Sequence, residues 1–310
     1  MNKVATRISQ VSLTIIVTWF ILNRVGIDLA TLKALEPADW KPNFFILTLS
    51  CVLLLVGYFF SAALWGKIVH DLGGPTLPAL TSVRLFMVAN LGRYVPGKVW
   101  QILGLTYLAK KEGVSGSVAI GAAILGQLTS LLAASLIGIS TLWYLADWRQ
   151  LKLASLIAGI IILVTLTSII TIPSIFRRII ILWTRLTRTE FPDNLKRQNN
   201  ISIRWLALYI INWCIYTTAF WLLYLSFGEW RTFIEIGPAF AAACVIGYLA
   251  IFAPAGAGIR EGFLVVLLQH AMSAEIALVL AVVSRLWTTA IEMILATICG
   301  AKYIQFKKTV

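Results

Sequence analysis

One stretch of the chain decides its fold: Asn90-Leu91-Gly92-Arg93-Tyr94-Val95-Pro96-Gly97-Lys98-Val99-Trp100-Gln101. These twelve residues carry two positive charges, two glycines and a proline within an apolar region. Proline lacks a backbone N–H and keeps the preceding residue out of helical geometry, while glycine lets the backbone turn. The pair Pro96-Gly97 therefore predicts that a helix breaks or bends sharply here.

A second stretch of this kind lies late in the chain. It runs from Pro254 to Gly262 and reads Pro-Ala-Gly-Ala-Gly-Ile-Arg-Glu-Gly. Its residues Pro254, Gly256 and Gly258 predict another helix break, which we expect to extend to Gly262 and to include the charged pair Arg260-Glu261. Each half of the chain thus contains one charged break.

The chain of 310 residues is too apolar for a soluble protein. Hydrophobic residues make up 59% of it, charged residues only 13%, and the mean hydropathy is +0.87. A soluble domain has on average about half its residues apolar and about a quarter charged. We therefore expect one all-α integral membrane domain over residues 1–310, with its Lys and Arg residues concentrated in cytoplasmic loops.

The apolar runs predict about six full membrane spans, since a span needs about 20 apolar residues. They are Ile8–Leu22, Phe44–Leu64, Val114–Leu145, Leu153–Ile172, Trp205–Phe227 and Ile276–Ala301. The two regions with the breaks, Ala79–Lys111 and Ile236–Ala271, contain apolar limbs that are too short to cross. We expect them to form re-entrant hairpins, because irregular backbone at membrane depth must be shielded by protein or line a wet cavity.

Loop charge predicts the orientation. With six spans, both termini, the loop at Lys67 and the basic segment Arg177–Arg204 fall on one side, which is therefore cytoplasmic. Asp147 and Glu229 then lie outside. Residues 1–146 and 147–310 each contain two spans, a hairpin and a span, and begin on opposite sides. This order is typical of an inverted-topology repeat, in which sites lie near the midplane at broken helices.

Ionisable side chains in the apolar regions are the candidate functional residues, since charges at membrane depth are costly. They are Arg84, Arg93, Lys98, Arg260, Glu261, Arg285 and Glu292. We predict that Arg93, Lys98 and Arg260 bind an anionic group. Two alternatives stay open: Arg93 and Lys98 reach lipid headgroups, or Arg260 pairs with Glu261.

The remaining candidates support this site. Arg285 and Glu292 are seven residues apart and share one helix face, and Glu292 is expected to neutralise Arg260 or Arg285. Asn90 and Tyr94 belong to the predicted substrate site. The amides of Gln101, Gln127 and Asn212 are expected to join helices to one another.

Several functions are not expected. The cations cluster between apolar runs, which argues against nucleic-acid binding. The cysteines show no metal-ligand spacing, all aspartates fall in loops, and His70 and His270 are far apart. No nucleophile elbow or nucleotide-binding motif occurs, so we expect no metal, no cofactor and no enzymatic activity.

The residues of the two breaks also match the motifs of a known family. They are Asn90, Gly92-Arg93-Tyr94, Pro96-Gly97-Lys98 and Trp100, then Pro254, Gly256, Gly258, Arg260 and Glu261, with Arg285 in the last span. In these residues the chain resembles the membrane family that includes the flippase part of bacterial lysylphosphatidylglycerol synthase/flippase proteins. The resemblance implies lipid translocation. It does not extend to the soluble aminoacyl-transferase domain of the two-part proteins, so lysyl transfer is not expected.

Together these observations predict a flippase that moves an anionic lipid, phospho- or polyprenyl-phosphate-linked, across the bacterial cytoplasmic membrane. One alternative is an integral-membrane enzyme that acts on a polyprenyl-phosphate or glycolipid. The other is an accessory subunit of a lipid synthase. The partners expected are the lipid and either a second copy of the chain or a lipid synthase.

Overall fold

The computed structural model describes residues 42–95, 99–144, 201–227, 230–250 and 253–306, together with five positions between 178 and 186. All regular secondary structure in these residues is helical. Four helices are long and apolar enough to cross a membrane: α3 (Phe44–Asp71), α6 (Gly116–Gly138), α10 (Ile201–Leu225) and α13 (Ala274–Phe306). A 3-10 helix, η3 (Ile139–Tyr144), continues α6. The chain is therefore a multi-pass membrane protein, and its described part is all-helical.

These helices agree with four of the six predicted spans. The other two predictions, Ile8–Leu22 and Leu153–Ile172, lie outside the described residues, as do both termini, Asp147, Glu229 and most of the basic segment. The bounds differ by several residues, and the largest difference inside the bundle is at the end of α3. Helix α3 continues past the predicted end at Leu64 to Asp71, because Ile68 and Val69 are buried in the core and Asp71 is held by α10.

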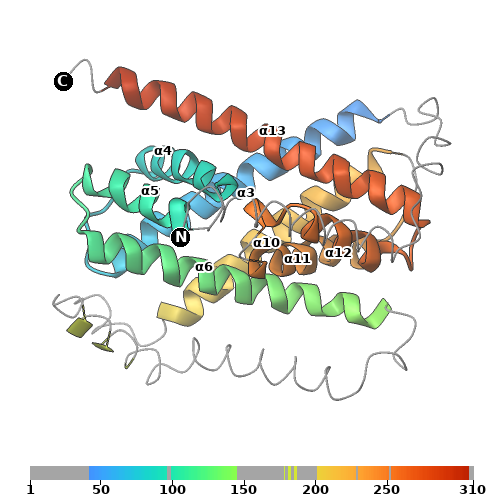
Figure 1. The fold of residues 1–310 in the computed structure, drawn as a ribbon, viewed down its shortest axis with the longest axis horizontal. Coiled ribbons are helices and arrows are strands. Elements are labelled where there is room, and N and C mark those ends of the chain that lie inside the picture. Colours follow the sequence, from blue (N-terminus) through green and yellow to red (C-terminus); the bar gives the residue numbers. More distant parts are fainter. Residues whose placement is uncertain are drawn as a thin grey trace, which may run out of the picture.

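Two pairs of shorter helices lie between α6 and α13 (Figure 1). The first pair is α4 (Ala79–Asn90) and α5 (Val99–Lys110), and the 3-10 helix η2 (Leu91–Tyr94) follows α4. The second pair is α11 (Phe233–Leu249) and α12 (Ile259–Leu268), with the 3-10 helix η4 (Pro254–Gly256) between them.

Both predicted helix breaks are present. No helix continues from α4 into α5, and the two pack against each other. Pro96, Gly97 and Lys98 lie outside the described residues. The second break is shorter than expected, since α12 begins at Ile259. Its start is fixed by Glu261, which accepts the Gly258 N–H at 2.7 Å. Whether either pair is re-entrant in a bilayer stays a prediction.

Helices α3 and α10 form the centre of the bundle and run antiparallel. The Asn43 N–H donates to the Ser226 carbonyl at one end (2.6 Å), and Trp205 Nε1 donates to the Asp71 carboxylate at the other (2.8 Å). Between them, the Asn212 amide donates to Ser61 Oγ at 2.6 Å. This is the interhelical role expected for Asn212.

The order of elements is the same in the two sequence halves. Around the central pair, α4, α5 and α6 follow α3, and α11, α12 and α13 follow α10. Helix α4 packs against α13 and helix α11 packs against α6, so each half contacts the other in a corresponding way. The division into inverted repeats at residue 146 stays a prediction.

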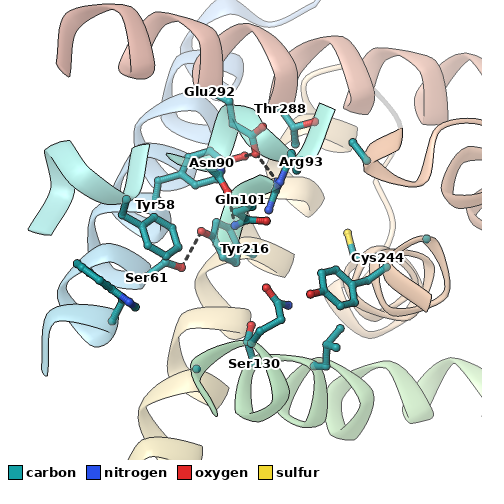
Figure 2. A pocket seen from close by; sticks show the side chains of 18 of the residues that line it. Tyr58, Ser61, Asn90, Arg93, Gln101, Ser130, Tyr216, Cys244, Thr288 and Glu292 are labelled. Carbon is teal, nitrogen blue, oxygen red and sulfur yellow. Dashed lines mark hydrogen bonds and ion pairs between the residues drawn. The ribbon is translucent and has the colours of Figure 1, made fainter. Parts of the chain in front are cut away.

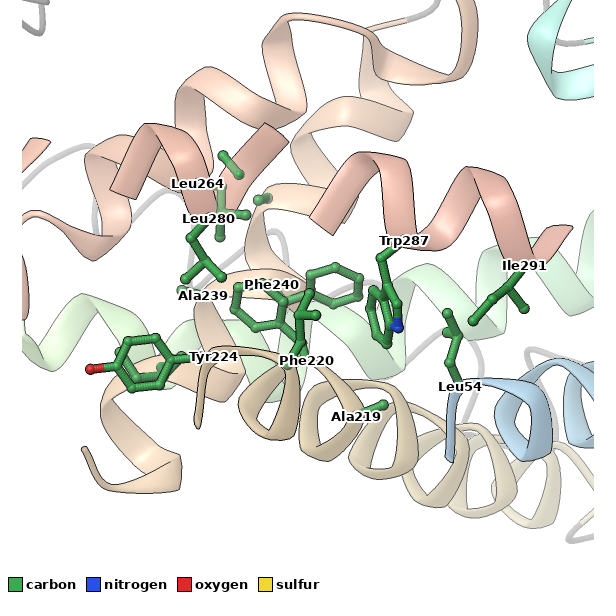
Figure 3. Close-up of a cluster of buried hydrophobic side chains, with 14 of the residues drawn as sticks. Leu54, Ala219, Phe220, Tyr224, Ala239, Phe240, Leu264, Leu280, Trp287 and Ile291 are labelled. Atoms are coloured by element: carbon green, nitrogen blue, oxygen red, sulfur yellow. The ribbon is translucent and has the colours of Figure 1, made fainter. Parts of the chain in front are cut away.

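An aromatic cluster joins α10, α11 and α13 beside the helix breaks (Figure 3). The rings of Phe220 and Phe240 stack with centroids 4.7 Å apart, and Trp287 meets Phe240 edge-on at 6.3 Å. Aromatic pairs in these arrangements are each worth about 0.5–1.5 kcal/mol beyond the area they bury. This cluster fixes Phe240, whose ring also faces a charged residue of the cavity described next.

Candidate functional site

A cavity of about 190 Å³ lies where the two helix breaks approach each other (Figure 2). Helices from both halves of the chain contribute to its wall. Its charged and amide-bearing side chains are Asn90, Arg93, Gln101, Gln127, Arg260, Arg285 and Glu292. Tyrosines from α3, η2, α10 and α11 line it as well. A cavity with several charges in an apolar bundle is the first candidate for a binding site.

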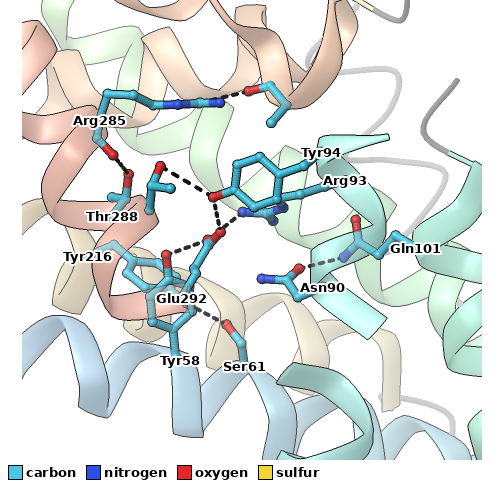
Figure 4. Close-up of polar contacts among 12 residues, drawn as sticks. Tyr58, Ser61, Asn90, Arg93, Tyr94, Gln101, Tyr216, Arg285, Thr288 and Glu292 are labelled. Carbon is cyan, nitrogen blue, oxygen red and sulfur yellow. Dashed lines mark hydrogen bonds and ion pairs between the residues drawn. The ribbon is translucent and has the colours of Figure 1, made fainter. Parts of the chain in front are cut away.

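Glu292 of α13 is the centre of a hydrogen-bond cluster on one wall (Figure 4). Its Oε1 accepts from Tyr58 OH at 2.5 Å and from Arg93 Nη1 at 2.7 Å, and its Oε2 accepts from Tyr94 OH at 2.6 Å. Only 4% of the Glu292 residue is exposed. A carboxylate at this depth needs such donors, since a buried charge without partners is strongly unfavourable. Glu292 therefore fastens η2 and α3 to α13.

The short α4–α5 connection is held by close backbone packing and one amide pair. Gln101 Nε2 donates to Asn90 Oδ1 at 2.8 Å, which joins the ends of α4 and α5. A side chain at Gly92 would place its Cβ 2.5 Å from the Gln101 backbone nitrogen. Glycine is therefore required here, and the close approach turns Arg93 and Tyr94 toward Glu292.

Arg285 of α13 holds the second break. Its Nη1 donates to the Ala255 carbonyl at 2.9 Å and lies 3.6 Å from Glu261 Oε1. Ala255 has φ +49°, a left-handed conformation that costs a non-glycine residue of the order of 1 kcal/mol. The guanidinium also lies 5.8 Å from the centre of the Tyr94 ring. Arg285 thereby links η4 to η2, so the two breaks are in contact through one side chain.

Arg260 differs from the other two arginines. It lines the cavity and is 9% exposed, and its Nε and Nη2 have no hydrogen-bond partner in the part of the chain that the structure describes. The guanidinium lies 4.9 Å from the centre of the Phe240 ring. Nε and Nη2 share one edge of a guanidinium, the edge that binds two oxygens of a carboxylate or phosphate at once. A buried, unsatisfied cationic edge is costly, which makes Arg260 the first candidate for binding an anion.

The position of Arg260 depends on two glycines. A Cβ at Gly247 would lie 2.7 Å from the Arg260 Cβ, and a Cβ at Gly256 would lie 2.6 Å from the Gly247 carbonyl oxygen. Gly256 also has φ +71°, which other residues rarely adopt. These contacts bring α11, η4 and the start of α12 together, and they account for the small residues of the second break.

Positive charge is in excess at the cavity. Within the described residues, Arg93, Arg260 and Arg285 stand against Glu261 and Glu292, which leaves one positive charge. Glu292 accepts a hydrogen bond from Arg93, and Glu261 lies 3.6 Å from Arg285 without a hydrogen bond to it. The unbalanced charge belongs to Arg260, and an anion is the ligand that would balance it.

The structure brings six of the predicted site residues to the cavity: Asn90, Arg93, Tyr94, Arg260, Arg285 and Glu292. Glu261 lies 3.6 Å from Arg285 and does not line the cavity, and Lys98 is outside the described residues. Glu292 was expected to neutralise Arg260 or Arg285, but it forms its ion pair with Arg93. Glu261, for which a pairing with Arg260 had stayed open, lies 3.6 Å from Arg285.

Other cavity residues gave no signal in the sequence. Tyr58 and Tyr216 lie in apolar spans, where tyrosine reads as a core or interface residue. Gln127 was expected to join helices, yet it lines the cavity and no hydrogen bond from its side chain occurs among the described residues. Arg84, also a candidate, does not line the cavity.

Comparison with known proteins agrees with this architecture. The model of the lysylphosphatidylglycerol synthase TM region family matches residues 7–296. A search of curated proteins gave no match, and neither did a search of solved structures. The match covers nearly the whole chain, including both helix breaks and every charged residue of the cavity. The chain therefore belongs to the lysylphosphatidylglycerol synthase TM region family, which is a family of membrane domains of the synthase/flippase kind.

Proposed function

We propose that this protein is a lipid flippase of the bacterial cytoplasmic membrane. Its substrate is a lipid with an anionic phosphate in the headgroup, phospho- or polyprenyl-phosphate-linked. The headgroup passes through the cavity between the two helix pairs while the hydrocarbon chains stay in the bilayer. A charged phosphate does not cross hydrocarbon unaided at a useful rate, because its transfer from water is prohibitively costly.

The unpaired edge of Arg260 is the observation that carries this proposal. Nε and Nη2 are buried and have no hydrogen-bond partner among the described residues. When a phosphate enters, a small turn of the side chain presents this edge to two phosphate oxygens. The gain is large because the unsatisfied state has already been desolvated.

The surrounding network explains how the site can change its state. Arg93 is held by Glu292, and Arg285 is held by Ala255 and Glu261. A phosphate that reaches Arg93 competes with Glu292 for the same guanidinium. Exchange of one anion for another lets η2 separate from α13 without leaving an unpaired charge. In this way substrate binding is coupled to movement of the first break.

Reconstitution tests the proposal. The purified protein is placed in vesicles that contain phosphatidylglycerol labelled on an acyl chain, and inward movement of the label is measured with a membrane-impermeant quencher. Arg260→Gln should slow transport by about tenfold or more, the worth of a charge-assisted hydrogen-bond pair. Arg84→Gln is the matched control, since it removes the same charge away from the cavity.

The same assay separates the alternatives. Transport by the purified protein alone contradicts the role of an accessory subunit. Chemical conversion of the lipid, read by mass spectrometry of the recovered vesicles, would favour the enzyme. Equal transport by Arg260→Gln and Arg84→Gln, both folded, would contradict the phosphate site.

A further inference from the structure

The wall of the cavity opposite Glu292 is polar, and none of its described residues carries a charge. Gln127 and Ser130 of α6 and Tyr209 of α10 line it. Ser130 Oγ accepts the Trp213 Nε1–H at 3.0 Å. Figure 2 shows Ser130 on the far side of the cavity from Glu292 and Arg93. The cavity therefore has one cationic side and one neutral, hydrogen-bonding side.

Gln127 and Tyr209 supply groups that suit hydroxyls. The Gln127 amide offers both a donor and an acceptor, and its side chain makes no hydrogen bond among the described residues. The Tyr209 hydroxyl can also donate and accept. A Cβ at Gly126 would lie 2.9 Å from that oxygen, so the glycine leaves room for it. A vicinal diol is a small group that uses such an arrangement fully.

The described part of the cavity offers no unengaged carboxylate to an amine. An ammonium group needs a carboxylate or a comparable acceptor when it leaves water. Glu292 already accepts three hydrogen bonds and pairs with Arg93. Glu261 pairs with Arg285 and does not line the cavity. A second cation would also be repelled by the uncompensated charge of Arg260.

We infer that the cavity selects a phosphodiester headgroup whose second half is a small uncharged polyol, such as glycerol, over a headgroup that bears an amine. The phosphate binds at Arg260, and the hydroxyls bind at Gln127 and Tyr209 on the opposite wall. This inference rests on the proposed function for the phosphate. It adds the class of headgroup, and it disfavours the aminoacylated lipid from which the family takes its description.

Competitive lipid binding to the purified protein, read by native mass spectrometry, tests the headgroup. The probes share their acyl chains: phosphatidylglycerol, phosphatidylethanolamine, lysylphosphatidylglycerol and phosphatidylmethanol, which has the phosphodiester but no polyol. Phosphatidylglycerol should bind about tenfold better than either amine-bearing lipid and several-fold better than phosphatidylmethanol, as one or two net hydrogen bonds predict. Free sn-glycerol-1-phosphate is added separately to ask whether the soluble headgroup suffices.

Variants localise the preference. Gln127→Leu should lower the affinity for phosphatidylglycerol to that for phosphatidylmethanol, and should leave phosphatidylmethanol binding unchanged. Gln269→Leu makes the same chemical change at an exposed residue away from the cavity and should have no effect. Loss of binding to every lipid in Gln127→Leu would indicate misfolding. In that case Gln127→Glu, which keeps the size of the side chain, is used instead. It should lose the preference for phosphatidylglycerol over phosphatidylmethanol.

Three results would overturn the inference. They are equal binding of amine-bearing lipids, a glycerol preference that survives Gln127→Leu, and competition by sn-glycerol-1-phosphate as strong as that by the lipid. If the protein binds the lipid but is not a flippase, the experiments give a different result. Phosphatidylglycerol would still be preferred in the binding experiment, but no transport would occur in vesicles. Transport of both lipid classes at equal rates would instead retain the flippase and reject the headgroup selection.

Discussion

Arg93 and Glu292 are 199 residues apart in the chain and form an ion pair of 2.7 Å across the cavity wall. Tyr58 and Tyr94 donate to the same carboxylate, so three helical elements meet at one side chain. The pair connects the first helix break with the last long helix. Because no described carboxylate forms a comparable ion pair with Arg260, the two breaks differ in their electrostatics. The first is tied into the protein, and the second carries the charge that is available to a ligand.

This pairing predicts a stability pattern in the variants. Arg93→Gln leaves a buried carboxylate with hydrogen bonds from two tyrosines but without its cation. We expect a loss of about 2 kcal/mol, less than for a fully enclosed pair, since the Arg93 side chain is partly exposed. The double variant Arg93→Gln, Glu292→Gln should recover most of it. Thermal unfolding in detergent measures both. Additive losses in the double variant would contradict direct coupling.

The sequence predicted the fold wherever backbone chemistry decided it. Prolines and glycines placed both helix breaks, and apolar run length placed four of the long helices. The end of α3 was missed because it depends on Asp71 being held by Trp205, a contact between helices far apart in sequence. The pairing of Glu292 was missed for the same reason. Spacing along one helix shows which residues share a face and not which helix packs against that face.

The sequence predicted the charged residues of the candidate site but not its neutral ones. Arginine and glutamate in an apolar span are conspicuous because they are costly there. Tyr58, Tyr209 and Tyr216 are not, since tyrosine is common in membrane spans as packing. The special state of Arg260 also has no sequence signal. Arg260 is left without an ion pair because Glu292 pairs with Arg93 and Glu261 lies beside Arg285.

A second prediction concerns the second break. Arg285→Gln removes the cation that lies beside Glu261, and it weakens or removes the bond to the Ala255 carbonyl. With less to hold the left-handed Ala255, η4 should open more often. Hydrogen exchange of residues 253–262, followed by mass spectrometry, should become several-fold faster than in the parent, as the loss of about 1 kcal/mol implies. Arg84→Gln serves as control, and unchanged exchange in Arg285→Gln would contradict this role.

A third prediction concerns orientation. Glu112 lies between α5 and α6, and Trp230, which is 75% exposed, lies before α11. The loop charges place Glu112 in the cytoplasm and Trp230 outside. In a variant with Cys51, Cys214, Cys244 and Cys299 replaced by alanine, Trp230→Cys should react with an impermeant maleimide in intact cells and Glu112→Cys only after permeabilisation. The reverse labelling pattern would show that the predicted orientation is inverted. Labelling of both Glu112→Cys and Trp230→Cys in intact cells would show that the α4–α5 pair does not return to the cytoplasm.

The last prediction tests whether the position of Arg260, and not only its charge, matters for transport. In Gly247→Ala the new Cβ would lie 2.7 Å from the Arg260 Cβ, so α12 must move away from α11. Neither atom is the end of a flexible side chain, and such overpacking typically costs about 1–3 kcal/mol. We expect transport and phosphatidylglycerol binding to fall together by several-fold while the protein remains folded. Gly104→Ala is the matched control, since its new Cβ meets nothing closer than 3.9 Å and alanine favours the helix. Full transport by Gly247→Ala, with a lowered unfolding temperature as proof of the strain, would show that the placement of Arg260 does not govern the reaction.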